Sequence, residues 1–92
     1  MEPTYKVHAN GTKEWYLNGK YHREDGPAVE KANGDKEWWQ NGKFHREDGP
    51  AVEYANGYKA WWLNGDYITG NQLVFLLKLH EYQLTSSNKQ KN

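Results

Sequence analysis

The sequence predicts a mainly β fold, an antiparallel meander of stacked β-hairpins followed by one C-terminal α-helix. Three observations carry this prediction: a 23-residue repeat, six Asn-Gly pairs, and an apolar pattern of helical period after Ile68. A fixed period of about 20–50 residues is typical of arrays in which each unit buries its apolar face against its neighbours. We therefore expect one continuous array rather than independent globular domains.

The repeat becomes visible when the chain is aligned with itself. Residues 15–37 and 38–60 are identical at seventeen of 23 positions, and both contain the string HREDGPAVE. A partial copy follows at 61–67, and half a copy precedes the first at 4–14. We assign residues 1–68 to the array.

The Asn-Gly pairs predict the turns. Asn-Gly between aromatic or β-branched residues is the strongest short-range hairpin signal, because both residues tolerate positive φ. The pairs alternate at spacings of eight and fifteen residues, so each repeat has room for two turns and two main strands, and about six to eight strands in all. A two-residue loop at Asn18-Gly19 would pair Tyr16 with Tyr21, and the later copies would share this register.

The second turn of each repeat favours a longer loop. A two-residue loop at Asn33-Gly34 would place like charges opposite each other. A three-residue loop over 32–34, with Gly34 left-handed, instead pairs Lys31 with Asp35 and Glu30 with Lys36.

Successive strand residues point to opposite faces of a sheet, so both faces of this one carry aromatic side chains. One face can form the core, and the other must be covered or left as an apolar patch. The first ladder is Trp15, Trp38 and Trp61, and the second, on the opposite face, is Tyr16, Trp39 and Trp62.

The repeated Asp-Gly-Pro interrupts the second strand of each unit. Proline removes a backbone donor, so Pro27 and Pro50 belong at a bulge or a strand start. Asp25 and Asp48 are suited to hold that turn through their side chains.

A helix is expected over residues 69–84, with Thr69 or Asn71 as its N-cap. One apolar stripe would cap the array, and a second stripe would close the aromatic face or bind another chain. Residues 85–92 are polar and form a flexible tail in this prediction. The second stripe, our candidate for self-association, is Phe75, Leu79 and Tyr82.

Composition narrows the function classes. The chain has 12 basic and 12 acidic residues, so no net field attracts nucleic acid or an anionic membrane. It has no cysteine, which excludes disulfides and thiolate metal sites. No signal-like or membrane-spanning segment is evident, and we expect a cytoplasmic protein.

Catalytic chemistry is not expected. His22 and His45 with Asp25 and Asp48 are the only constellation to weigh as a metal or catalytic site, yet each unit supplies at most two ligands. A structural role, with histidine stacked on tryptophan and aspartate holding a turn, is favoured. No nucleophile motif or phosphate-binding loop is present. We predict no enzyme activity, no cofactor and no metal.

The pattern W-x-x-N-G-K-x-H-x-x-x-G-P-A-x-x-x-x-N-G resembles a variant of the MORN repeat, which also has a 23-residue period. The departure is Arg-Glu-Asp-Gly-Pro-Ala, where the common repeat has small residues and further glycines. The string NGKxHREDGPA resembles repeats in small proteins of tailed bacteriophages and other large DNA viruses. The resemblance, over about residues 5–67, implies a hairpin-array fold, a viral origin and a binding or scaffolding role. The residues that carry it are Trp15, Gly19, Lys20, His22, Gly26 and Gly34, and Trp38, Gly42, Lys43, His45, Gly49 and Gly57.

We therefore expect a non-catalytic protein-binding module, a phage-encoded inhibitor of a host defence protein such as a CRISPR or nucleotide-signalling component. A homo-oligomer is also expected, since the half repeat leaves an uncapped edge. The alternatives are a small-nucleotide or single-stranded nucleic-acid binder that uses the aromatic ladder, and a scaffold. The predicted partner surface comprises Tyr16, Tyr21, Trp39, Phe44, Trp62 and Tyr67, rimmed by Arg23, Glu24, Arg46 and Glu47.

Overall fold

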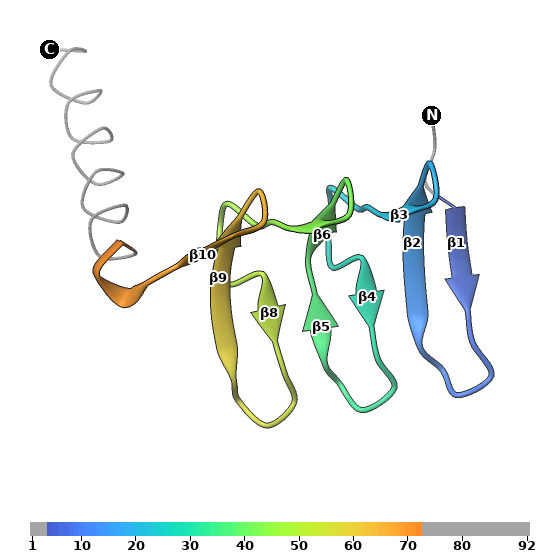
Figure 1. Ribbon diagram of the computed structural model, residues 1–92. Coiled ribbons are helices and arrows are strands. Elements are labelled where there is room, and N and C mark those ends of the chain that lie inside the picture. Colours follow the sequence, from blue (N-terminus) through green and yellow to red (C-terminus); the bar gives the residue numbers. More distant parts are fainter. Residues whose placement is uncertain (1–3, 73–92) are drawn as a thin grey trace, which may run out of the picture.

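The computed structural model describes residues 4–72 of the chain, which form an antiparallel sheet of short strands (Figure 1). The predicted mainly β, antiparallel fold is confirmed. Each strand pairs with a neighbour that is close in sequence, so the chain advances along the sheet as a meander. The strands are β1 (Thr4–Val7), β2 (Lys13–Leu17), β3 (Lys20–Tyr21), β4 (Val29–Glu30), β5 (Lys36–Glu37), β6 (Trp39–Gln40), β7 (Lys43–Phe44), β8 (Val52–Glu53), β9 (Lys59–Leu63) and β10 (Asp66–Ile68).

The turns drawn at the top of Figure 1, which we call the upper turns, are two-residue Asn-Gly loops. Asn18 has φ 52° and Gly19 has φ 76°, and the two later upper turns repeat these values closely. Left-handed backbone at both positions matches the right-handed twist of the flanking strands. The predicted register is confirmed, and it pairs Tyr16 with Tyr21, Trp39 with Phe44 and Trp62 with Tyr67.

The turns at the bottom of Figure 1, the lower turns, contain three residues, as predicted. Glu30 pairs with Lys36, and the Lys31 amide donates to the Asp35 carbonyl oxygen at 2.8 Å. Here only the glycine, Gly34, has positive φ, at 100°. The carbonyl oxygen of the Asn33 side chain instead accepts the Asp35 amide at 3.0 Å and so fixes the loop from inside.

The repeated Arg-Glu-Asp-Gly-Pro segment breaks each descending strand in two. The Trp15 carbonyl oxygen accepts the His22 amide at 3.0 Å, while the Trp15 amide donates to Ala28 at 2.9 Å. One residue of β2 therefore bonds to both sides of the interruption, and residues 23–27 loop out of the sheet. The predicted interruption is confirmed, and it separates β3 from β4 and β7 from β8. With a further break at Trp38, between β5 and β6, the described residues contain ten short strands rather than six to eight.

Strands β6 and β7 form a two-stranded sheet beside the eight-stranded sheet of the other strands, and backbone hydrogen bonds join the two on both sides. On the β3 side, the Arg23 amide donates to Trp39 at 3.1 Å and the Gly42 amide donates to Tyr21 at 3.0 Å. On the β9 side, the equivalent bonds from Arg46 and Gly65 measure 3.3 and 2.9 Å. All the described strands thus form one continuous layer.

The fully buried side chains are small or polar. A single layer has little interior, and the aromatic rings of the sheet stay half-buried or exposed. The buried apolar residues are Ala28, Val29, Ala51, Val52 and Ala60, and the buried polar ones are His22, Glu37 and His45.

Beyond β10, only the first residues of the predicted helix are described. Residues 70–72 are helical, and Thr69 is the N-cap, because its hydroxyl accepts the Gln72 amide at 3.2 Å. The Gln72 side chain accepts the Thr69 amide at 3.0 Å in return, which completes a capping box. The rest of the predicted helix, the tail and the self-association residues Phe75, Leu79 and Tyr82 lie outside the described residues.

Candidate interaction surfaces

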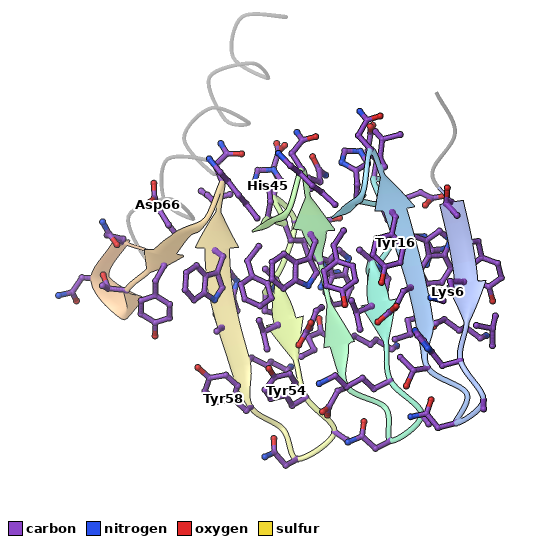
Figure 2. The ribbon with its side chains drawn as sticks, turned by 45° about the vertical axis from the view of Figure 1, so that its right-hand side comes forward. Lys6, Tyr16, His45, Tyr54, Tyr58 and Asp66 are labelled. Atoms are coloured by element: carbon purple, nitrogen blue, oxygen red, sulfur yellow. The ribbon has the colours of Figure 1, made fainter. Side chains whose placement is uncertain are left out.

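One face of the sheet carries a continuous row of six aromatic rings, the aromatic ladder, which crosses the sheet just below the upper turns. Figure 2 shows Tyr16 at its N-terminal end, on the face turned toward the viewer. The strands place these rings on one face because paired positions of an antiparallel sheet point the same way. The ladder is Tyr16, Tyr21, Trp39, Phe44, Trp62 and Tyr67.

The rings of the ladder pack against one another. Successive ring centroids lie 5.0, 5.3, 3.9, 5.3 and 5.4 Å apart. The first four contacts have interplanar angles of 30–49°, so neighbouring rings cover much of each other's faces. At the end of the row, Tyr67 meets Trp62 edge-on and remains 55% exposed. The ladder therefore presents a half-buried apolar surface that consists largely of ring edges.

A carboxylate, Glu14, lies beneath the N-terminal end of the ladder. It accepts hydrogen bonds from His8 at 2.6 Å, from the Tyr16 hydroxyl at 2.5 Å and from the Tyr21 hydroxyl at 3.1 Å. Burial opposes ionisation, but the hydrogen bonds from His8 and the two tyrosines outweigh it, and the pKa of Glu14 is lowered.

The same network acts on the tyrosines that donate to Glu14. The hydrogen bond to that carboxylate, followed by burial, raises the pKa of Tyr16. Burial first, and then the hydrogen bond to Glu14, raises the pKa of Tyr21. Both hydroxyls are therefore held protonated as donors, and the N-terminal end of the ladder is anchored.

Glu37 plays the corresponding role 23 residues later, beneath Trp39. It is buried, and it accepts from the Trp39 indole nitrogen at 3.0 Å and from the Tyr54 hydroxyl at 3.3 Å. Burial and then the charge of Glu37 raise the pKa of Tyr54. A carboxylate thus lies under each of the first two aromatic pairs of the ladder, whereas the third pair, Trp62 and Tyr67, has Ala60 at this position.

The opposite face of the sheet carries the other tryptophans, two of them covered by arginine. The guanidinium carbon of Arg23 lies 3.8 Å from the ring centroid of Trp15, and that of Arg46 lies 3.9 Å from that of Trp38. Cation–π contacts of this kind stabilise by about 0.5–2 kcal/mol, depending on desolvation. Tyr5 also packs on Trp15, with the two ring centroids 4.8 Å apart.

Each arginine also binds its own loop. Arg46 donates to Asp48 at 3.0 Å, to the Pro50 carbonyl oxygen at 3.1 Å and to Glu53 at 2.6 Å. Arg23 makes the equivalent three contacts in the first repeat. The planar five-donor fork of arginine is suited to closing such a loop, which lysine could not do.

This arrangement corrects the predicted partner surface. Arg23 and Arg46 were expected to rim the aromatic ladder together with Glu24 and Glu47. They lie on the opposite face instead, because each stacks on the tryptophan that precedes a ladder residue in its strand. The six aromatic residues come together as expected, and the four charged ones form a second surface on the loops.

The two histidines of the motif hold neighbouring repeats together. The imidazole Nδ1 of His22 accepts the Asn41 amide at 3.0 Å, and that of His45 accepts the Asn64 amide at 3.0 Å. An Nδ1 that accepts a hydrogen bond leaves the proton on Nε2, which faces Glu24 in the first repeat, at 3.1 Å. The role expected for these histidines was stacking on tryptophan, whereas the bonds that the structure shows go to the next upper turn.

The residues weighed as a metal site do not converge. Asp25 and Asp48 accept from arginine, and both imidazole nitrogens of His22 and His45 are engaged. Within residues 4–72, no group of three or more potential ligands could hold a metal ion.

A groove lies between the two Arg-Glu-Asp-Gly-Pro loops, the segments that leave the sheet, on the face opposite the ladder. It has a volume of about 550 Å³, with Trp38 and Gln40 among its lining residues. Four carboxylates line it, and at 78–88% exposure all are well solvated. They are Glu24, Asp25, Glu47 and Asp48.

The carboxylate anchors Glu14 and Glu37 were missed by reasoning from the sequence, although a signal was present. Each stands two positions before a ladder residue, so strand alternation places it on the ladder face. His8 and Tyr54, which donate to them, directly follow the neighbouring strands β1 and β8.

Comparison of the chain with protein-family models, with curated proteins and with solved structures finds no match. Among the described residues, no helix is long and apolar enough to cross a membrane.

Proposed function

We propose that the protein is a non-catalytic binding module that uses its aromatic ladder to engage another protein. The continuous row of six half-buried rings on one open face is the observation that carries this proposal. Tyrosine and tryptophan dominate binding energy at protein interfaces, because they bury a large area at little entropic cost. The hydrogen bonds to Glu14 and Glu37 add preorganisation, which lowers the cost of binding.

A protein partner suits the ladder better than a nucleotide or a single strand of nucleic acid. Bases bind to such proteins by stacking on free ring faces inside a basic groove. In the ladder the ring faces are taken up by neighbouring rings, and carboxylates lie beneath two of the three aromatic pairs. The exposed ring edges of the ladder are suited to packing against apolar side chains on the surface of another protein.

The partner we propose is a host protein, and the chain itself a virus-encoded inhibitor that acts in the host cytoplasm. This part rests on the resemblance of the NGKxHREDGPA string to repeats of tailed bacteriophages and other large DNA viruses. The same resemblance supports a MORN-like hairpin array as the finer description of the fold. A host defence component, such as a CRISPR or nucleotide-signalling effector, is the target class we favour.

Affinity capture from host lysate tests the proposal. We expect the wild-type chain to retain a specific protein, and the Trp39→Ala and Tyr67→Asp variants to lose it by tenfold or more, since truncation of an aromatic hot spot costs about 2 kcal/mol or more. Tyr5→Ala is the matched control, because Tyr5 is 51% exposed on the opposite face.

Two results would count against the ladder as the binding surface. Equal retention of the same protein by all variants would indicate that the Arg-Glu-Asp-Gly-Pro loops form the binding site, and Arg46→Glu would then be the variant to test. Recovery of nucleic acid or a bound nucleotide, with no protein, would favour the alternative function.

A further inference from the structure

The two ends of the sheet, at β1 and at β9, have strand edges whose backbone groups could pair with each other. β1 pairs with β2 along one side only. At the other end, β9 pairs with β10 from Trp61 upward, while Lys59 and Ala60 pair only with β8. Among residues 4–72, no strand lies on the outer side of β1 or beside this lower part of β9 (Figure 1). Edges of this kind are templates for pairing with another strand.

Within one chain, strands equivalent to these two edges pair with each other at two places. The lower part of β2 pairs with β4, and β5 pairs with β8. By the sequence repeat, Lys59 and Ala60 correspond to the residues of β2 and β5 that make these pairs. β1 corresponds to β4 and β8, since all three lead into a lower turn that contains Ala-Asn-Gly. The registers are Lys13↔Glu30 with Glu14↔Val29, and Lys36↔Glu53 with Glu37↔Val52.

The lower turns give a second, independent indication. A Cβ added at Gly11 would lie 3.6 Å from the Cβ of Ala32, and one at Gly34 would lie 3.5 Å from the Cβ of Ala55. Each of these glycines thus accommodates the alanine of the following turn. The third lower-turn glycine, Gly57, has no such neighbour within 4 Å among the described residues.

We propose that two copies of the chain associate head to tail, with β1 of one copy adding to the lower part of β9 of the other. The internal registers then place Val7 of the second copy opposite Lys59 and Lys6 of the second copy opposite Ala60. Ala9 of the second copy lies against Gly57, as the two later alanines lie against their glycines. The sheet continues across the junction.

The contact is heterologous, so it leaves one free edge at each end and adds further copies in a row. Only a few backbone hydrogen bonds form at each junction, and the association is therefore weak and dependent on concentration. It uses sheet edges, not the ladder, and it stands apart from the proposed function.

Cysteine cross-linking between two single-site variants tests the register. The chain has no native cysteine, so any disulfide formed comes from the introduced residues. We mix Val7→Cys protein with Lys59→Cys protein under mild oxidation. Residues opposite each other in an antiparallel pair have Cα atoms about 4.5–5.5 Å apart, within the range that a disulfide spans.

The matched control mixes Val7→Cys protein with Lys36→Cys protein. Lys36 is the counterpart of Lys59, and both are exposed, but strands β4 and β8 occupy both sides of β5. We expect the mixed dimer of the first pair to form several-fold faster than that of the control. Equal rates in the two mixtures, or no mixed dimer in either, would overturn the proposal.

A backbone variant provides the second measurement. The amide of His8 faces β2, where it donates to Thr12 at 2.8 Å, so alternation turns the Val7 amide outward. Val7→Pro removes this outward donor and Val7→Ala keeps it. Sedimentation of folded samples should show concentration-dependent species larger than a monomer for Val7→Ala and a loss of them for Val7→Pro. A monomer at every concentration for the wild-type chain would also overturn the proposal.

Discussion

At the scale of single residues, the histidine four positions after the asparagine of the first two upper turns links one copy of the motif to the next through a single nitrogen. In the second repeat, Nδ1 of His45 accepts the Asn64 amide at 3.0 Å, and the side chain of His45 is only 9% exposed. His45→Ala removes the acceptor and leaves that amide without its partner. A buried donor left unsatisfied costs about 1–3 kcal/mol.

We therefore expect His45→Ala to lower the free energy of unfolding by about 1–3 kcal/mol, measured by urea denaturation. Glu47→Ala serves as its control, because this 83% exposed residue contacts the other nitrogen of the same ring. The control should lose less than about 1 kcal/mol, as is usual for exposed pairs. Comparable losses in both variants would contradict the assigned role of Nδ1.

Glu14 makes stability depend on pH. Its pKa in the folded protein is lowered, since the hydrogen bonds from His8, Tyr16 and Tyr21 outweigh burial. A carboxyl with a lowered folded pKa contributes its full stability above the unfolded pKa of about 4.5, and loses it as pH falls through the folded value. Wild type should therefore exceed Glu14→Gln in stability at neutral pH, and the difference should shrink below about pH 4.5.

Urea midpoints of the two proteins from neutral to acidic pH measure this difference. A difference that stays constant over that range would show that ionisation of Glu14 does not contribute to stability. Lys6→Gln provides a control, since Lys6 pairs with Glu14 across β1 and β2 but makes none of these hydrogen bonds.

At the scale of single elements, the lower turns depend on glycine. Gly34 has φ 100°, a conformation that side chains with a Cβ rarely adopt, and the turn also brings Ala55 close. Gly34→Val should lower the free energy of unfolding by about 1–3 kcal/mol, the usual cost of a strained backbone position. Gly70→Ala is the control, because Gly70 has no positive φ and no atom of residues 4–72 would lie within 4 Å of an added Cβ. Thermal unfolding followed by circular dichroism compares the two.

The hairpins show how far the sequence predicts the elements. The registers of both turn types followed from local chemistry, since Asn-Gly and Ala-Asn-Gly each specify a loop length. The interruption of β3 and β4 followed from Pro27. The face toward which this five-residue loop leaves the sheet could not be predicted from Pro27. It depends on the stacking of Arg23 on Trp15, a contact between strands.

The histidine contacts were also beyond local reasoning. His22 and Asn41 lie 19 positions apart, and the bond between them exists only because neighbouring repeats are in register. The ladder itself was predictable, since strand alternation alone assigns its faces. The charged residues were predicted to lie beside the ladder because they are close to it in sequence. They lie on the other face, because they belong to the loop that leaves the sheet there.

At the scale of the whole molecule, the described part of the chain is a single sheet with two chemically different faces. One face carries the aromatic ladder with its carboxylate anchors, and the other carries the arginine-covered tryptophans and the acidic groove. The five tryptophans divide between these faces: Trp39 and Trp62 belong to the ladder, and Trp15, Trp38 and Trp61 to the opposite face.

This division makes one measurement decisive for the claim that the ladder is the binding surface. Each tryptophan has one indole N–H, which gives its own signal in a ¹H–¹⁵N correlation spectrum. We would titrate the labelled chain with the protein that it captures from host lysate. We expect the signals of Trp39 and Trp62 to shift or broaden while those of Trp15, Trp38 and Trp61 stay in place. Shifts confined to the latter three, with Trp39 and Trp62 unchanged, would contradict the account.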